Sequence, residues 1–197
     1  MEKYFKSVNC ENIKEIVYNS AKEYGDKTAF VIKQKNGKDV TYKNISFKEF
    51  LNDVNSFGTE LYKLGYKDKR IAITGRNRYE WVVAHIANLT GGILSIPLDK
   101  ELQIDEFESC LKRSKADVLV FDEKYIDMIE EIKKRGNTQV KEYICMAEQE
   151  GYKNFWDLKD DGAKFVEQGE KEYIEAEIDS YKMAILLFTS GTTSKSK

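Results

Sequence analysis

Apolar residues recur along the chain with a few characteristic spacings, and these spacings predict its helices and strands. Apolar positions three and four residues apart predict an amphipathic helix that has Asn9 as a candidate cap and ends at Gly25. Two β-rich runs follow, at 28–34 and 39–42, and the Asn-Gly pair between them favours the tight turn of a hairpin. The amino-terminal part therefore predicts a helix and then a β-hairpin.

A second helix is predicted by its capping pattern as well as by its apolar face. In the run from Ser46 to Glu49, the serine and glutamate side chains can reciprocally satisfy free backbone amides at a helix start. Apolar residues then follow at helical spacing until Gly65, which is suited to a left-handed stop.

From Arg70 onward, strand-like runs alternate with helical patterns. The predicted strands are 71–74, 93–98, 117–121, 140–146 and 183–188, and the predicted helices are one capped by residues 77–80, one at 105–113, one at 125–134 and one that holds Trp156, Leu158, Phe165 and Val166. This alternation predicts parallel strands joined by helical crossovers. The expected fold is α/β: a layered α/β/α arrangement with a mainly parallel sheet, in which 183–188 is a central strand, and an amino-terminal hairpin. Residues 1–197 are expected to form one portion of a domain, divided into 1–66 and 67–197.

Composition and charge exclude several classes of function. The 32 basic and 34 acidic residues nearly cancel, so no global field would draw the chain onto nucleic acid. The amino terminus has no apolar signal core and no apolar run is long enough to span a bilayer, which predicts a cytoplasmic protein without an integral membrane segment. Cys10, Cys110 and Cys145 lack the close pairs of a zinc or redox site and are expected to be reduced, structural thiols.

The end of the chain carries the clearest candidate chemistry. Six hydroxyl side chains, one glycine and two lysines follow the apolar run 183–188, within 189–197. Hydroxyls, closely approaching backbone amides and lysine charge suit a polyphosphate. In open α/β sheets ligands bind beyond the carboxyl ends of the strands, where we expect this loop to lie. A Walker loop is excluded, because it needs two glycines with Lys and Ser or Thr directly after the second, and only Gly191 is present.

Three other groups of polar residues are weaker candidates for a site. His85 shares a helical face with apolar residues, so a packed or hydrogen-bonded histidine is expected rather than a catalytic one. Arg76 and Arg78 flank a helix start, where an anion could bind, but a solvated loop with Asn77 as the cap is preferred. The acidic patches 106–108 and 160–161 are expected to be exposed.

The terminal loop resembles a known signature. Residues Thr189, Ser190, Gly191, Thr192 and Thr193 match without a gap the Thr-Ser-Gly-Thr-Thr-Gly-x-Pro-Lys loop of the acyl-adenylate-forming (AMP-binding) enzymes, and Lys197 falls on the lysine that closes it. The sequence departs at Ser194, where the family usually has glycine, and at Ser196, where it usually has proline. Upstream landmarks occur in the family's order at 24–30, 40–42, 64–67, 77–81 and 91–99. This ordered set is similar to the long-chain fatty acid–CoA ligase branch and covers most of residues 13–197.

This resemblance implies a two-step reaction. A carboxylate attacks the α-phosphate of Mg²⁺-bound ATP to give an acyl-adenylate, and the thiol of CoA then displaces AMP. By carry-over, Thr189, Ser190, Gly191, Thr192, Thr193 and Lys197 would wrap the β- and γ-phosphates. The family's magnesium-binding, adenine-binding and mobile-domain lysine residues would lie beyond residue 197, so neither a metal ligand nor a catalytic residue outside the loop is expected here. The chain by itself is expected to be inactive.

Two alternatives remain open. One is a sister ligase for an aromatic, short-chain or amino acid, because the residues that select the acid lie mostly downstream. The other is a non-catalytic nucleotide-binding or dimerising module. Peripheral membrane contact and a homodimer are both compatible with the sequence.

Overall fold

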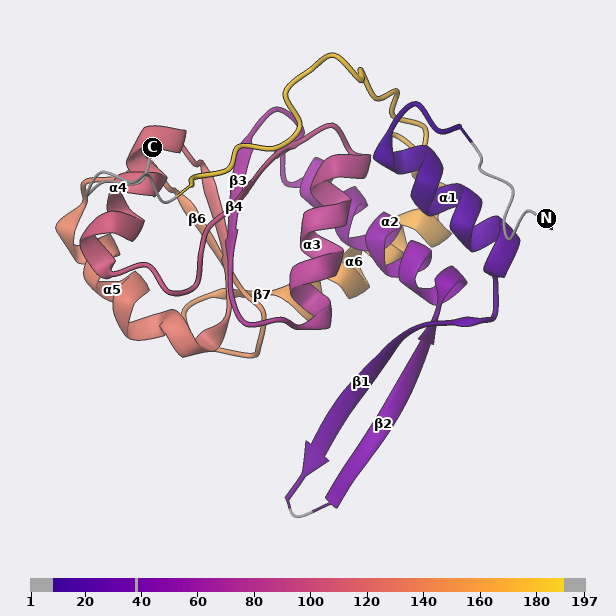
Figure 1. Ribbon diagram of the computed structural model, residues 1–197, viewed down its shortest axis with the longest axis horizontal. Helices are drawn as coiled ribbons and strands as arrows, with labels where there is room; N and C mark the ends of the chain where they lie inside the picture. Colours follow the sequence, from indigo (N-terminus) through magenta and orange to yellow (C-terminus); the bar gives the residue numbers. More distant parts are fainter. Residues whose placement is uncertain (1–8, 38, 190–197) are drawn as a thin grey trace, which may run out of the picture.

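The computed structural model describes residues 9–37 and 39–189, and in that part of the chain helices cover both faces of a parallel sheet (Figure 1). The helices are α1 (Ile13–Tyr24), α2 (Phe47–Lys63), α3 (Tyr79–Thr90), α4 (Ile104–Ser114), the short η1 (Glu123–Tyr125), α5 (Ile126–Arg135) and α6 (Phe155–Glu167). The strands are β1 (Thr28–Asn36), β2 (Asp39–Ser46), β3 (Arg70–Thr74), β4 (Leu94–Pro97), β5 (Val118–Phe121), β6 (Glu142–Cys145) and β7 (Lys153–Asn154).

The five-stranded sheet has the order β4-β3-β5-β6-β7, and every neighbouring pair is parallel. Alternate residues of its central strands enter two separate cores. Ile71 and Val120 pack under α2, α3 and α6, whereas Ala72 and Leu119 pack under α4 and α5. The predicted α/β/α layers are thereby confirmed, and their cause is a sheet whose central strands are apolar on both faces.

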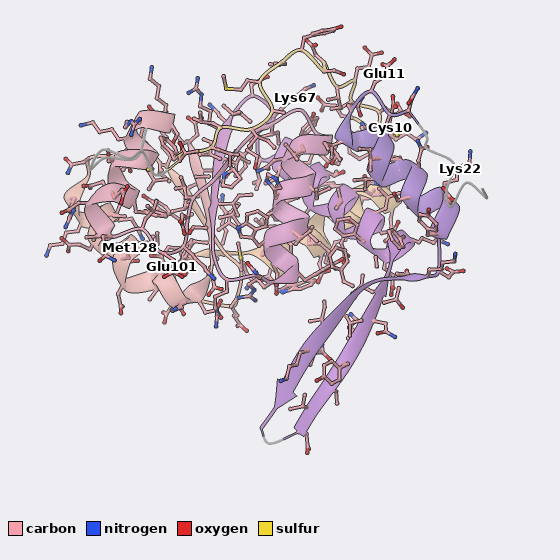
Figure 2. All side chains as sticks on the ribbon, in the orientation of Figure 1. Cys10, Glu11, Lys22, Lys67, Glu101 and Met128 are labelled. Carbon is pink, nitrogen blue, oxygen red and sulfur yellow. The ribbon has the colours of Figure 1, made fainter. Side chains whose placement is uncertain are left out.

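The amino-terminal hairpin projects away from these layers (Figure 1). Strands β1 and β2 pair antiparallel from Asn36–Asp39 down to Thr28–Ser46, as predicted, and Gly37 takes a φ of 62° in the turn. Figure 2 shows the outer part of the hairpin with side chains extending into open space on both sides, whereas those of the body fill the layers. Val31 and Tyr42 remain 60% and 65% exposed, because the hairpin packs on the body only near its base.

Most predicted helix ends are confirmed by backbone geometry. Ser46 Oγ accepts the Glu49 N–H at 3.1 Å while Glu49 Oε2 accepts the Ser46 N–H at 2.7 Å, which is the capping box. Gly25 ends α1. The cap of α1 is Asn12 rather than Asn9, because the Asn12 side chain lies within reach of the Glu15 amide, at 3.0 Å.

Three polypeptide segments differ from the prediction made from sequence. The helix α6 is confirmed, but the short strand β7 before it was not predicted, since Lys153 and Asn154 carry no β-rich run. Helix α3 begins at Tyr79, and its N-cap residue is Arg78, which makes no side-chain cap hydrogen bond, so the predicted Asn77 cap is wrong. The run 183–188 is not a central strand, as described below.

The three cysteines are free; Cys110 and Cys145 are buried and Cys10 is half-buried, as expected for structural thiols. Burial raises the pKa of the Cys110 and Cys145 thiols, which keeps them protonated and unreactive. Within residues 9–37 and 39–189, no helix is long and apolar enough to cross a bilayer.

Candidate functional site: the terminal segment and the sheet edges

The segment that leads to the predicted phosphate loop lies at the edge of the sheet. It joins β4 through a single isolated parallel bridge between Ser95 and Ile185, instead of forming a central strand. The Leu186 side chain packs half-buried on the core beneath α4 and α5, whereas Met183 and Leu187 are 65% and 62% exposed. The prediction of a buried strand is wrong for a physical reason: alternate side chains of an extended segment point to opposite faces, and only the face toward α4 and α5 is covered.

The segment also contacts helix α4. The Phe188 ring lies 5.1 Å from the Arg113 guanidinium, in the last turn of α4. That turn lies by the start of β3, because Arg70 Nη1 donates to the Ser114 carbonyl at 2.8 Å. The segment, yellow in Figure 1, passes beside β4 toward α4. The segment therefore runs parallel to β4 and contacts the last turn of α4.

Of the predicted phosphate-binding residues, the structure describes only Thr189, which is exposed. Ser190, Gly191, Thr192, Thr193 and Lys197 lie outside the described residues. Among the described residues, no group of three or more His, Cys, Asp and Glu side chains could hold a metal ion. The chemistry of the loop therefore still rests on its sequence.

A charged cluster occupies the carboxyl ends of β3 and β5. The fully buried Asp122, directly after β5, accepts hydrogen bonds from Arg76 Nε at 2.7 Å and Arg76 Nη2 at 2.8 Å. Arg78 donates to both carboxylate oxygens of Glu80 at 2.8 Å and to Glu123 at 2.6 Å. The cluster thus joins two guanidinium groups to three carboxylates.

The cluster corrects the prediction of a solvated loop. The Arg78 side chain is only 22% exposed, and Arg76 is half exposed, with both held in ion pairs. Burial by itself raises the pKa of Asp122, but the hydrogen bonds from Arg76 and from the Lys124 amide outweigh it, so the pKa is lowered. Hydrogen bonding to Glu80 raises the pKa of Arg78. Since the carboxylates already compensate the arginines, this cluster offers no excess positive charge for an anion.

Sequence reasoning missed Asp122 and Glu123 as partners of the two arginines. The signal that could have found them is their place directly after a predicted strand that pairs with the strand before Arg76. Parallel neighbours end at the same edge of a sheet, so side chains that follow them meet.

A cleft of about 1330 Å³ lies between the hairpin and the start of α3. On its wall, Tyr79 donates to Asp53 Oδ2 at 2.7 Å and Trp156 Nε1 donates to Glu80 at 3.1 Å. Burial, and then the charge of Asp53, raise the pKa of Tyr79, so this phenol stays protonated. Lys159 lies 3.9 Å from Asp53 and also pairs with Asp160. These groups satisfy one another, so the wall of the cleft is a structural network.

His85 is packed and hydrogen-bonded, as predicted. Its ring lies 5.1 Å from the Trp81 ring, and its Nδ1 lies 2.8 Å from Ser95 Oγ. Burial lowers the pKa of His85. The acidic patch at 160–161 is exposed as expected, but Phe107 in the patch at 106–108 is buried, and Glu108 pairs with Arg135 at 3.3 Å.

Comparisons with known proteins place this arrangement in a family. A family model described as AMP-binding enzyme matches residues 17–197. Crotonobetaine/carnitine–CoA ligases of Shigella flexneri and of Escherichia coli strain K12 / DH10B are 25% identical over 196 residues, which is 96% of this chain and 36% of theirs. The chain therefore spans about a third of the length of these curated relatives.

Solved structures share the fold. An anthranilate–CoA ligase in complex with anthranoyl-AMP superposes with a TM-score of 0.74 at 22% identity, over 94% of this chain and 33% of that one. A long-chain-fatty-acid–CoA ligase from Archaeoglobus fulgidus superposes with a TM-score of 0.71 at 15% identity, over 96% and 36%. Together with the family model, which covers most of the sequence, these findings support one conclusion: the chain belongs to the AMP-binding enzyme family.

Proposed function

We propose that residues 1–197 are the amino-terminal portion of the AMP-binding domain of an ATP-dependent, AMP-forming acid–CoA ligase. The observation that carries this proposal is the family match, which runs from residue 17 to Lys197 and includes the loop that begins at Thr189. In this reaction a carboxylate displaces pyrophosphate from ATP, and the thiol of CoA then displaces AMP from the acyl-adenylate. ATP, Mg²⁺ and CoA would be required by the complete ligase.

Within the chain, the loop would hold the β- and γ-phosphates of ATP. Thr189, Ser190, Thr192 and Thr193 supply hydroxyl donors, and Gly191 allows backbone amides to approach closely. Lys197 would act as a point charge toward the leaving pyrophosphate. The compensated charges around Asp122 support this assignment, because they leave the loop as the better anion site.

The loop is not a complete active site. The residues that would bind adenine and magnesium, and most of the pocket for the acid, have no counterpart among the groups described above. The 197-residue chain is therefore expected to lack ligase activity by itself. A cytoplasmic location and a homodimer stay predictions from the sequence.

For the acid, we propose a long-chain fatty acid, on the ordered landmarks that begin at Tyr24 and end at Asp99. A second candidate is a small acid of the carnitine type, because the curated relatives named for crotonobetaine and carnitine are 25% identical over nearly the whole chain. Both candidates would be adenylated by ATP and transferred to CoA in the same way, and they differ only in the carboxylic acid.

The test is ATP–pyrophosphate exchange by the complete protein, with palmitate, crotonobetaine, carnitine and anthranilate supplied separately. We expect exchange with palmitate and none without an acid. Exchange with crotonobetaine alone would replace the fatty acid by the second candidate, and no exchange with any carboxylate would refute the ligase. A stop codon directly after Lys197 would contradict the amino-terminal assignment.

A matched control keeps the claim about the isolated chain separate. The 197-residue chain is assayed beside the complete protein under the same conditions. Measurable exchange by this chain would show that the loop and the described fold suffice for adenylation, contrary to our proposal.

A further inference from the structure

Two polar side chains of α3 converge on one residue of β4. His85 Nδ1 lies 2.8 Å from Ser95 Oγ, and Asn88 Nδ2 donates to the same oxygen at 3.3 Å. His85 and Asn88 share a face of α3 because they are one helical turn apart. Ser95 and Asn88 are fully buried, so this small network lies inside the layer between α3 and the sheet.

One assignment of hydrogen-bond donors and acceptors satisfies most polar atoms of the network. The Ser95 hydroxyl accepts from Asn88 and needs an acceptor for its own hydrogen. The Asn88 Oδ1 atom is buried without a partner, so it does not take that hydrogen. A neutral imidazole that is unprotonated at Nδ1 does, and burial favours neutral His85. The ring of Trp81, 5.1 Å away, packs against His85 and limits its rotation.

The backbone of Ser95 makes both hydrogen bonds of the bridge to the terminal segment. Its N–H donates to the Ala184 carbonyl at 3.0 Å, and its carbonyl accepts from the Leu186 N–H at 3.0 Å. In the described part of the chain, this is the one isolated bridge outside the named strands. Ser95 is thus tied to α3 by its side chain and to the segment before Thr189 by its backbone.

We propose that Ser95, held by His85 and Asn88, is a positioning residue that sets the register of segment 183–188 on β4 and hence the place where the phosphate-binding loop begins. This inference rests on the proposed function of the loop. A network that only satisfied buried polar groups would contribute to global stability. Loss of a positioning network must in addition loosen the bridge between Ser95 and segment 183–188 and weaken ATP binding, while binding of the acid stays unchanged.

The first test follows the Leu186 amide by hydrogen–deuterium exchange, resolved by NMR, in the protein and in the variants Ser95→Ala and His85→Leu. Loss of one hydrogen bond that holds the bridge should speed exchange at Leu186 about fivefold more than at amides in the centre of β5. In His85→Asn, the Asn oxygen can accept from Ser95 in place of Nδ1, so protection should return toward the wild-type value. Exchange at Leu186 that equals the wild type in both Ser95→Ala and His85→Leu would overturn the proposal.

Tyr173→Phe is the matched control for a purely structural effect. The Tyr173 hydroxyl bonds to the Ala87 carbonyl at 2.8 Å and pairs with Thr90 Oγ1 at 2.6 Å, so it ties to the same helix without contacting the bridge. This variant should lower global stability without a selective change at Leu186. A selective change there of the same size would show that any weakening of α3 loosens the bridge, which would also overturn the proposal.

The second test is kinetic and uses the complete protein. Ser95→Ala should raise the KM for ATP about fivefold and leave the KM for the acid within about twofold, because the loop is proposed to hold the phosphates of ATP. Equal changes in both KM values, or none, would refute a positioning role. Absence of activity in the wild-type protein would refute the proposed ligase instead, while exchange at Leu186 would still decide whether Ser95 anchors the segment.

Discussion

The aromatic ring of Tyr173 lies directly against Gly58 of α2. A Cβ atom built on Gly58 would lie 2.0 Å from Cζ of that ring, closer than atoms can approach. Tyr173 is fully buried, and its hydroxyl is fixed by Ala87 and Thr90, so the ring cannot retreat. The segment after α6 is thereby fastened between α2 and α3, in the core that lies under these two helices.

This contact predicts that Gly58→Ala destabilises the protein although alanine favours helices. In an open helical position the change would stabilise by about 1 kcal/mol. Here overpacking should lower the free energy of unfolding by about 1–3 kcal/mol, measured by urea denaturation. Ser109→Ala, at an exposed position of α4, is the control and should change stability little. A stabilised Gly58→Ala variant would show that the ring moves freely.

The ion pair of Asp122 predicts a loss of stability in acid. Its folded pKa is lowered from the ordinary value of 3.8, so the native carboxylate binds protons less readily than the unfolded one. Its contribution is complete above about pH 4 and is lost as the pH falls through the folded pKa. Asp122→Asn should lower the free energy of unfolding at neutral pH by about 1–3 kcal/mol, because it removes the buried charge that accepts hydrogen bonds from the half-exposed Arg76.

The pH profile separates this effect from a general loss of packing. Urea denaturation at pH values between about 2 and 7 should give a smaller decrease in acid for Asp122→Asn than for the wild type. Asp160→Asn, which changes an exposed carboxylate, is the control. Parallel profiles for the wild type and Asp122→Asn would contradict the assigned pKa direction.

His85 predicts a second, separate dependence on pH. It is the single histidine of the chain, and burial lowers its pKa from 6.5. The unfolded state therefore takes up a proton below about pH 6.5 before the native state does, so the free energy of unfolding falls as the pH drops from there toward the folded pKa. NMR titration of the ring gives the folded pKa directly.

In His85→Asn this slope should be absent, because no group then titrates at that position. The two proteins are compared by urea denaturation at about pH 5.5 and about pH 7.5. A slope that persists unchanged in His85→Asn would assign it to another group.

The phosphate loop predicts a specific role for Lys197. In the complete protein, Lys197→Ala should lower kcat/KM for ATP–pyrophosphate exchange about 100-fold, as for the loss of one donor to developing negative charge. Lys195→Ala removes a nearby positive charge at the variable position of the signature and should have a much smaller effect. Equal losses in both variants would indicate a general electrostatic attraction for ATP rather than a placed lysine.

Much of the fold could be predicted from local pattern. The hairpin, α2 and the alternation from β3 to β6 agree with the structure because hydrogen bonding within a helix, and the burial of a central strand, leave their own apolar spacing in the sequence. The capping box at Ser46 was equally readable, since both of its partners lie in one helical turn. The strand β7 was not, because two residues are too short to show any period.

The candidate site was predicted less completely. The loop from Thr189 was readable as phosphate-binding chemistry, but its residues after Thr189 lie outside the described part of the structure. The ion pairs of Arg76 and Arg78 could not be predicted from the sequence. Their partners Asp122 and Glu123 are distant in the chain and meet the arginines only when β3 and β5 pair.

The sequence by itself determined the types of element, their order and the chemistry of the terminal loop, since each depends on residues close together in the chain. Only the tertiary structure decided which elements are neighbours. It placed segment 183–188 at the sheet edge, anchored through Ser95, although its apolar run is typical of a central strand. The physical reason is that burial and charge compensation depend on what packs against a residue, and a local pattern does not contain that information.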